Sequence, residues 1–330
     1  MRRAIVAAAL FVALIAIAVF LPGLGRSASG RGIVIAGGSW TERQILAEVT
    51  AQMIRHHIPA ADVTVVDDLG STTLIHYGMM GGDLNMSGAM YTGTSLTGEL
   101  GLPMTTDPEE AMEIVVREYD RRFGRKWYPS WGFANTYAFM VSGELAEREG
   151  LRKVSDLARL APGLRAGVDP SWMEREGDGY AAFTEKYGFS FGSIYPMEVA
   201  LVYKAVSAGE IDVALGYSTD GRIATYGLGM LEDDLHFFPP YDASIVATHR
   251  VLEQWPELDA VLMRLVGTID SAQMQRMNRD ADEELVSPQT VARQFLEAHR
   301  YFEGTKMPPR PPVSSPSRGE GEQDMEEDPR

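Results

Sequence analysis

The sequence predicts an α/β protein built from two lobes. The chain has 330 residues, of which 45% are hydrophobic, which is more apolar material than one compact core usually encloses. Between residues 32 and 302, short apolar runs alternate with amphipathic segments, a pattern typical of largely parallel sheets covered by helices. The alternation comes in two rounds, so we expect one sheet in each lobe.

The first round begins with a strand at residues 32–36. Ser39 or Thr41 is expected to cap the following helix, in which apolar residues recur at helical spacing from Ile45 to Ile54. Valines then mark a second strand at residues 63–66.

A further helix is predicted to begin at Asp107, because an Asp cap is followed by Pro108 at the first helical position and by two glutamates near the positive end of the helix dipole. Its expected buried stripe consists of Met112, Val115, Val116 and Tyr119.

The second round begins after residue 135. Its expected strands are 136–141, 164–168 and 212–216, and its expected helices are 155–160 and a segment around 198–206. From residue 244 the chain holds one strand and then helices, including 257–266 and 288–301. This excess of helices predicts that the chain returns to the first lobe.

The two ends of the chain have a different composition. Residues 1–31 contain Arg2 and Arg3, an apolar run from Ala4 to Leu21 and then small residues, which indicates a signal peptide or an N-terminal membrane anchor. Either interpretation predicts an extracytoplasmic protein, in the periplasm or on the outer face of the cytoplasmic membrane. Residues 304–330 are acidic and rich in proline, and we expect a disordered tail.

Composition and spacing exclude several functions. A net charge of −16 argues against nucleic acid as a partner, because such partners need clustered basic residues. The absence of cysteine excludes thiolate metal sites and cysteine nucleophiles. His56 and His57 would point about 100° apart on a helix. We therefore expect no metal and no cofactor.

Four stretches of sequence together carry a family resemblance. They are Trp40-Thr41-Glu42, Tyr91-Thr92-Gly93-Thr94, Phe133 to Ala138, and Ser218 to Arg222 followed by Phe237 to Asp242. In this order and spacing they resemble the glycine betaine, choline and carnitine (osmoprotectant) binding proteins of ABC importers. The resemblance implies a two-lobed periplasmic-binding-protein clamshell of type II with two interlobe crossings. We place lobe 1 at residues 32–135 plus 241–303 and lobe 2 at residues 136–240.

The resemblance implies a transport function. The expected protein captures a quaternary-ammonium osmoprotectant such as glycine betaine, choline or carnitine, and delivers it to a permease that works with a cytoplasmic ATPase. It is expected to be a monomer. It is not expected to be an enzyme, because the acid and base would have to be Asp220 and Arg222 or Glu42 and Arg43, and no nucleophile stands beside either pair. The alternatives are a membrane-anchored sensory domain of the same fold and a binding protein for another cationic metabolite.

The resemblance also implies an aromatic cage for the ligand. A trimethylammonium group has no N–H to donate and carries a spread charge, so aromatic faces suit it better than hydrogen-bond acceptors. The implied cage consists of Tyr91, Tyr137, Tyr217 and Tyr241. Tyr91 and Tyr217 each follow an apolar strand-like run, and strand ends are where α/β proteins place ligands.

If the ligand is a betaine, its carboxylate needs a partner. The resemblance assigns Arg175 to this role, because arginine offers paired donors to a carboxylate, with Thr94 adding a hydroxyl and Asn135 lining the site. Many relatives carry a lysine where this chain has Gly38, so the expected carboxylate clamp is reduced. This difference argues against betaine and leaves choline, carnitine or another osmolyte open. Arg43, where relatives often have glutamine, either partly replaces that charge or faces solvent.

Overall fold

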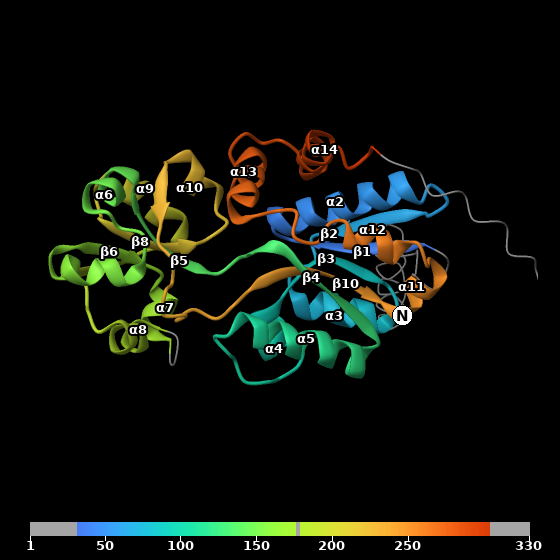
Figure 1. Ribbon diagram of the computed structural model, residues 1–330, viewed down its shortest axis with the longest axis horizontal. Helices are drawn as coiled ribbons and strands as arrows, with labels where there is room; N and C mark the ends of the chain where they lie inside the picture. Colours follow the sequence, from blue (N-terminus) through green and yellow to red (C-terminus); the bar gives the residue numbers. More distant parts are fainter. Residues whose placement is uncertain (1–31, 176–178, 304–330) are drawn as a thin grey trace, which may run out of the picture.

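The structure, a computed structural model, describes residues 32–175 and 179–303, which fold into two lobes (Figure 1). The first lobe is built on a five-stranded sheet of order β2-β1-β3-β10-β4, and the second on a five-stranded sheet of order β7-β6-β8-β5-β9. The first sheet comprises β1 (Ile33–Gly38), β2 (Val63–Asp67), β3 (Met86–Tyr91), β4 (Arg125–Ala134) and β10 (Asp242–Thr248). The second comprises β5 (Tyr137–Ser142), β6 (Arg165–Val168), β7 (Ser193–Pro196), β8 (Val213–Tyr217) and β9 (Leu228–Met230).

Helices accompany both sheets. With the first sheet lie α2 (Thr41–His57), α3 (Thr72–Gly81), α4 (Thr92–Thr97), α5 (Pro108–Phe123), α11 (His249–Gln254), α12 (Leu258–Met263), α13 (Ser271–Asp282) and α14 (Pro288–Ala298). With the second lie α6 (Gly143–Glu149), the short 3-10 helices η1 (Val154–Arg159) and η2 (Ala161–Gly163), α7 (Pro170–Glu174), α8 (Tyr180–Tyr187), α9 (Val199–Ser207) and α10 (Gly221–Thr225).

The inner strands of each sheet are buried on both faces, which explains their continuous apolar runs. Successive side chains of a strand point to opposite faces. In β1, Ile33 and Ile35 join the core that contains residues of α2 and α14, while Val34 joins the core that contains residues of α3 and α5. In β5, Phe139 and Met140 divide between two cores in the same way.

Two chain segments cross between the lobes and lie side by side. One joins β4 to β5 through Asn135 and Thr136, and the other joins β9 to β10. The N–H of Asn135 donates to the carbonyl of Tyr241 at 3.1 Å, and the hydroxyl of Thr136 donates to the carbonyl of Pro239 at 3.1 Å. The predicted clamshell with two crossings is confirmed. The lobe boundaries at residues 135/136 and 240/241 stay a prediction.

Helix α13 forms an additional contact between the lobes. It packs against α2 and α14 of the first lobe and also against α10 of the second. The Gln275 side chain donates to the carbonyl of Ser218 at 2.7 Å, and Asn278 Nδ2 donates to the carbonyl of Thr219 at 2.8 Å. A Cβ atom on Gly221 would lie 2.5 Å from the backbone nitrogen of Arg279, so only glycine permits this approach of α10.

Two local predictions are wrong. Neither Ser39 nor Thr41 caps α2: its N-cap is Trp40, without a side-chain hydrogen bond, and the Thr41 hydroxyl instead donates to Asp282 at 2.6 Å. Val116 is 40% exposed, because the buried face of α5 is centred on Ala111, Val115 and Tyr119. The Asp107 cap is confirmed, since its carboxylate accepts the N–H groups of Glu109 and Glu110.

The predictions for the chain ends, residues 1–31 and 304–330, lie outside the described residues. Within residues 32–175 and 179–303, the structure contains no helix with the length and apolar character needed to cross a bilayer.

Candidate functional site

A cavity of about 400 Å³ lies between the two lobes, and its lining comes from both lobes and from both crossings. All of the predicted site residues line it: Tyr91, Thr94, Asn135, Tyr137, Arg175, Tyr217 and Tyr241. Lining residues that the sequence reasoning left out of the site are Trp40, Glu42, Arg43, Gly70, Ser71, Thr72 and Thr136.

Three of the four tyrosines reach the cavity from strand ends, and Tyr241 immediately precedes β10. Tyr91 is the last residue of β3, Tyr217 is the last residue of β8, and Tyr137 is the first residue of β5. Because β5 and β8 are antiparallel and pair Tyr137 with Tyr217, the two rings lie on the same side of the sheet. Their centroids are 5.2 Å apart with an interplanar angle of 33°.

Tyr241 packs closely against the start of α4, because Gly93 has no side chain to block this approach. A Cβ atom at Gly93 would lie 2.6 Å from the carbonyl oxygen of Pro240 and 3.0 Å from the Tyr241 ring. The Thr92 hydroxyl donates to the same carbonyl at 3.1 Å. The second crossing and its tyrosine are therefore fixed to the first lobe through the start of α4.

Glu42 organises the first-lobe side of the cavity. The Tyr91 hydroxyl donates to Glu42 Oε1 at 2.6 Å, and Asn135 Nδ2 donates to the same oxygen at 3.1 Å. Asn278 Nδ2 donates to Oε2 at 3.1 Å. Burial, together with the nearby carboxylate of Glu42, raises the pKa of Tyr91 well above its usual value, so the ring remains a neutral phenol.

Arg175 lies beside Tyr137 on the second-lobe side. Its guanidinium carbon is 5.4 Å from the centroid of the Tyr137 ring, and Nη2 donates to the phenol oxygen at 3.3 Å. The Tyr137 hydroxyl donates to Asp169 Oδ2 at 2.9 Å. Burial and the neighbouring Tyr217 raise the pKa of Tyr137, so this ring too remains neutral.

Arg43 is buried, so the alternative in which it faces solvent is wrong. Its Nε and Nη2 atoms donate to the carbonyl of Ala89 at 3.3 Å and 2.7 Å. Its guanidinium carbon lies 5.6 Å from the centroid of the Tyr91 ring. Burial lowers the pKa of Arg43, yet an arginine keeps its charge in proteins.

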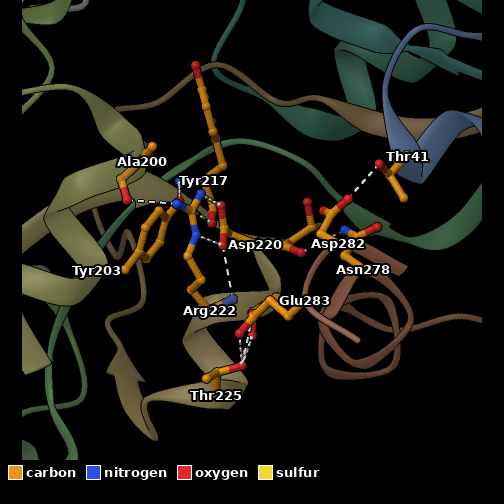
Figure 2. A network of polar contacts seen from close by, with 12 residues as sticks. Thr41, Ala200, Tyr203, Tyr217, Asp220, Arg222, Thr225, Asn278, Asp282 and Glu283 are labelled. Atoms are coloured by element: carbon orange, nitrogen blue, oxygen red, sulfur yellow. Dashed lines mark hydrogen bonds and ion pairs between the residues drawn. The ribbon is translucent and has the colours of Figure 1, made fainter. Parts of the chain in front are cut away.

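A second cavity of about 280 Å³ adjoins the first and shares Trp40, Glu42, Asn135 and Tyr217 with it. The polar contacts around it join α10 and α13 (Figure 2), and the hydroxyl of Thr225 donates to Glu283 at 2.9 Å. Asn278 and Asp282 of α13 line this second cavity.

Asp220 and Arg222 form a structural pair beside the cage. Arg222 donates to both carboxylate oxygens of Asp220, at 2.8 Å and 2.6 Å, and its guanidinium carbon lies 4.5 Å from the Tyr203 ring (Figure 2). The Tyr203 hydroxyl in turn accepts the backbone N–H of Tyr217 at 2.7 Å. This chain of contacts fixes the end of β8, where Tyr217 enters the cavity.

Within residues 32–175 and 179–303, no grouping of three or more His, Cys, Asp or Glu residues could hold a metal ion.

Comparison with known proteins places this geometry in a family. Residues 31–298 match the family model described as the substrate binding domain of ABC-type glycine betaine transport system. The carnitine transport binding protein OpuCC of Listeria monocytogenes is 46% identical over 284 residues, which cover 86% of this chain and 92% of that protein. A glycine-betaine-binding protein of Pseudomonas aeruginosa is 33% identical, with 86% of this chain and 92% of that protein covered.

A solved structure agrees with these matches. The crystal structure of a glycine betaine/carnitine/choline ABC transporter superposes with a TM-score of 0.79 at 45% identity, and the match covers 82% of this chain and 100% of that one. The family resemblance predicted from the sequence is confirmed. This chain belongs to the family of substrate binding domains of ABC-type glycine betaine transport systems.

Proposed function

We propose that this protein is the solute-binding subunit of an ABC importer and captures a quaternary-ammonium osmoprotectant between its lobes. The observation that carries the proposal is the position of four tyrosines, Tyr91, Tyr137, Tyr217 and Tyr241, around one cavity. They come from both lobes and from the second crossing, so a ligand that contacts all of them stabilises the closed arrangement of the lobes.

The chemistry of the cage suits a trimethylammonium group. Its methyl groups and spread charge can pack against aromatic faces, and each such contact contributes about 0.5 to 2 kcal/mol, more when the site is dry. Four contacts of this size sum to about 2 to 8 kcal/mol. Micromolar binding needs about 8 kcal/mol net of the costs of association, so the polar contacts at the other end of the ligand must contribute as well. The raised pKa values of Tyr91 and Tyr137 keep these rings neutral.

Polar groups line the same cavity and suit the carboxylate of a betaine or carnitine. Arg175 offers a guanidinium, Thr94 a hydroxyl and Asn135 an amide, and all three lie in the cavity wall. Glycine betaine and carnitine both carry a trimethylammonium and a carboxylate, whereas choline carries a hydroxyl in place of the carboxylate. The proposed ligand therefore places its cation among the tyrosines and its other end against these polar groups.

The family of this chain consists of ABC substrate-binding domains, which work outside the cytoplasm with a permease. The family match favours the importer over a sensory domain. We propose further that the protein acts as a monomer, that its permease is driven by a cytoplasmic ATPase, and that residues 1–31 direct its export. We also propose that the ligand is released unchanged. Asp220 and Arg222 beside the cage pair with each other and fix the end of β8.

Tryptophan fluorescence can test this proposal. Trp40 is 60% exposed and lines the cavity, so an occupant of the cage should change its emission. Glycine betaine, carnitine and choline are titrated separately, and NMR of the recovered ligand checks for turnover. The expected result is a saturable change with at least one ligand, reduced in Trp40→Phe, with the ligand recovered intact. Chemical conversion of the ligand, or no response to any of the three, would contradict the proposal.

A further inference from the structure

We infer that Arg43 makes the cavity selective for zwitterionic ligands over choline. A fixed positive charge in the cavity wall attracts the carboxylate of a betaine and repels a cation that brings no negative charge of its own. This inference rests on the proposed function and names the substrate class of that same site.

The Arg43 side chain lies in an unusual environment for a charged group. Arg43 is 6% exposed and lines the cavity. Among the described residues, its guanidinium donates to the backbone carbonyl of Ala89 and lies 3.8 Å from the sulfur of Met90. Within this part of the chain, no carboxylate forms an ion pair with it and its Nη1 atom has no hydrogen-bond partner. A buried charge of this kind is costly unless something compensates it.

The neighbouring acidic residue does not fill this role. Glu42 is adjacent in sequence, but its two oxygens accept hydrogen bonds from Tyr91, Asn135 and Asn278. Burial is the dominant influence on the pKa of Arg43 and lowers it, while Tyr91, Glu99 and Glu42 partly oppose this shift through their charge. A ligand carboxylate beside Nη1 would supply the missing partner directly.

The end of β1 leaves space for the Arg43 side chain. Gly38 has a φ of +89°, a conformation that favours glycine, and a Cβ atom there would lie 3.1 Å from Cδ of Arg43. A side chain at position 38 would therefore press on the aliphatic part of the arginine. Gly38 thus allows the Arg43 side chain to run along the cavity wall.

Each lobe places one arginine beside a tyrosine of the cage. Arg43 lies beside Tyr91 in the first lobe, and Arg175 lies beside Tyr137 in the second, with guanidinium-to-ring distances of 5.6 Å and 5.4 Å. A lone cation between these tyrosines faces a guanidinium group on each side, while the Glu42 carboxylate in the same wall already accepts three hydrogen bonds. A zwitterion offers a carboxylate to one or both guanidinium groups while its ammonium group contacts the rings.

The test compares three ligands by isothermal titration calorimetry. Glycine betaine, carnitine and choline are titrated into the wild-type protein, Arg43→Gln and Arg55→Gln. Glutamine can retain a hydrogen bond to Ala89 while removing the charge. Arg55 is the matched control, because it lies on the same helix with a side chain that is 38% exposed and paired with Glu48.

The wild type is expected to bind the zwitterions about tenfold or more tightly than choline, the effect of roughly one charge-assisted hydrogen bond. Arg43→Gln should lose about tenfold in affinity for glycine betaine and carnitine, and its affinity for choline should stay constant or rise. Arg55→Gln should match the wild type. Arg43→Lys, which keeps the charge, should retain most of the preference for zwitterions.

Several outcomes would overturn the inference. If the wild type binds choline as tightly as glycine betaine, Arg43 does not make the cavity selective. This measurement uses the wild-type protein alone, so it does not depend on the folding of any variant. Equal losses for all three ligands in Arg43→Gln would mean that the arginine only supports Tyr91. In both cases the cage stands and the proposed function survives. If the wild type binds none of the three ligands, the proposed function fails and the inference fails with it.

Discussion

The hydroxyl of Tyr91 donates a hydrogen bond of 2.6 Å to Glu42, and this contact ties the cage to the wider architecture. The same carboxylate accepts from Asn135 in the first crossing and from Asn278 on α13. Asn278 also donates to the carbonyl of Thr219 in the second lobe. A single buried carboxylate thus links an aromatic wall of the cavity to two of the places where the lobes meet.

Glu42→Gln is expected to weaken ligand binding and the fold together. An amide at this position must direct its NH₂ group at one of three donors, so at least one hydrogen bond is lost and two donors face each other. We expect a loss of about 1 to 3 kcal/mol in the free energy of unfolding and about tenfold in affinity. Urea denaturation and calorimetry measure the two effects. Glu48→Gln, on the same helix, serves as the control, and identical behaviour of the two variants would contradict the role of Glu42.

Tyr217→Ala is expected to reduce affinity for every quaternary ammonium ligand by about tenfold or more, because one desolvated cation–π contact is lost. Tyr217→Phe should retain most of the affinity, since the aromatic face remains. Calorimetry with glycine betaine and choline checks both variants. Tyr77→Ala, which removes a tyrosine that is 63% exposed on α3, should bind like the wild type. An unchanged affinity in Tyr217→Ala would remove this ring from the cage.

Gly93→Ala is expected to weaken binding by displacing Tyr241. The added methyl group would lie 2.6 Å from the carbonyl of Pro240 and 3.0 Å from the Tyr241 ring, so the ring or the crossing must shift. We expect a loss of about tenfold in affinity, comparable to the loss of one aromatic contact. Gly163→Ala is the matched control, because a methyl group there meets nothing within 4 Å. Normal affinity in Gly93→Ala would show that the position of Tyr241 is not limiting.

Glu118 is expected to make the stability of the protein sensitive to acid. Hydrogen bonds from Arg121 and Arg122, at 2.6 Å and 2.7 Å, lower the pKa of this carboxyl to about 2. Because the folded pKa is below the unfolded value of 4.5, the stabilisation is present above pH 4.5 and is lost as the pH falls from there towards 2.

The measurement is the melting temperature of Glu118→Gln between pH 7 and pH 2. The wild type should lose more thermal stability than the variant over the acidic part of this range. Glu113→Gln, which alters an exposed glutamate of the same helix, should follow the wild type. Parallel curves for the wild type and Glu118→Gln would refute the role of this carboxyl.

The parts of the fold that could be predicted are those with a simple local signal. Asp107 followed by Pro108 specifies a helix start through the cap and the fixed φ of proline, and the structure has this start. By contrast, β4 was not predicted. It contains Pro129 and Gly132, the latter with a φ of +115°, and its pairing with β10 is interrupted by register shifts. These irregularities hide the alternation of apolar and polar residues by which a strand is recognised.

The residues of the site could also be predicted only in part. The predicted tyrosines all line one cavity, because the resemblance gave their positions and strand ends meet at the interlobe cleft. The sequence could not decide between a place in the site and a solvent-facing position for Arg43, since a charged residue on an amphipathic helix usually faces solvent. Its position depends on the conformation of Gly38 at the end of β1 and on the carbonyl of Ala89 in β3. Such contacts between distant segments leave no local pattern in the sequence.

Calorimetric titration of the purified protein with glycine betaine, carnitine, choline and proline betaine tests the central claim most directly. The account predicts micromolar binding of at least one of these ligands, and a loss of about tenfold or more in affinity when Tyr217 is replaced by alanine. An absence of binding to all four, with a protein that melts cooperatively, would contradict the assignment of the cavity to quaternary ammonium compounds.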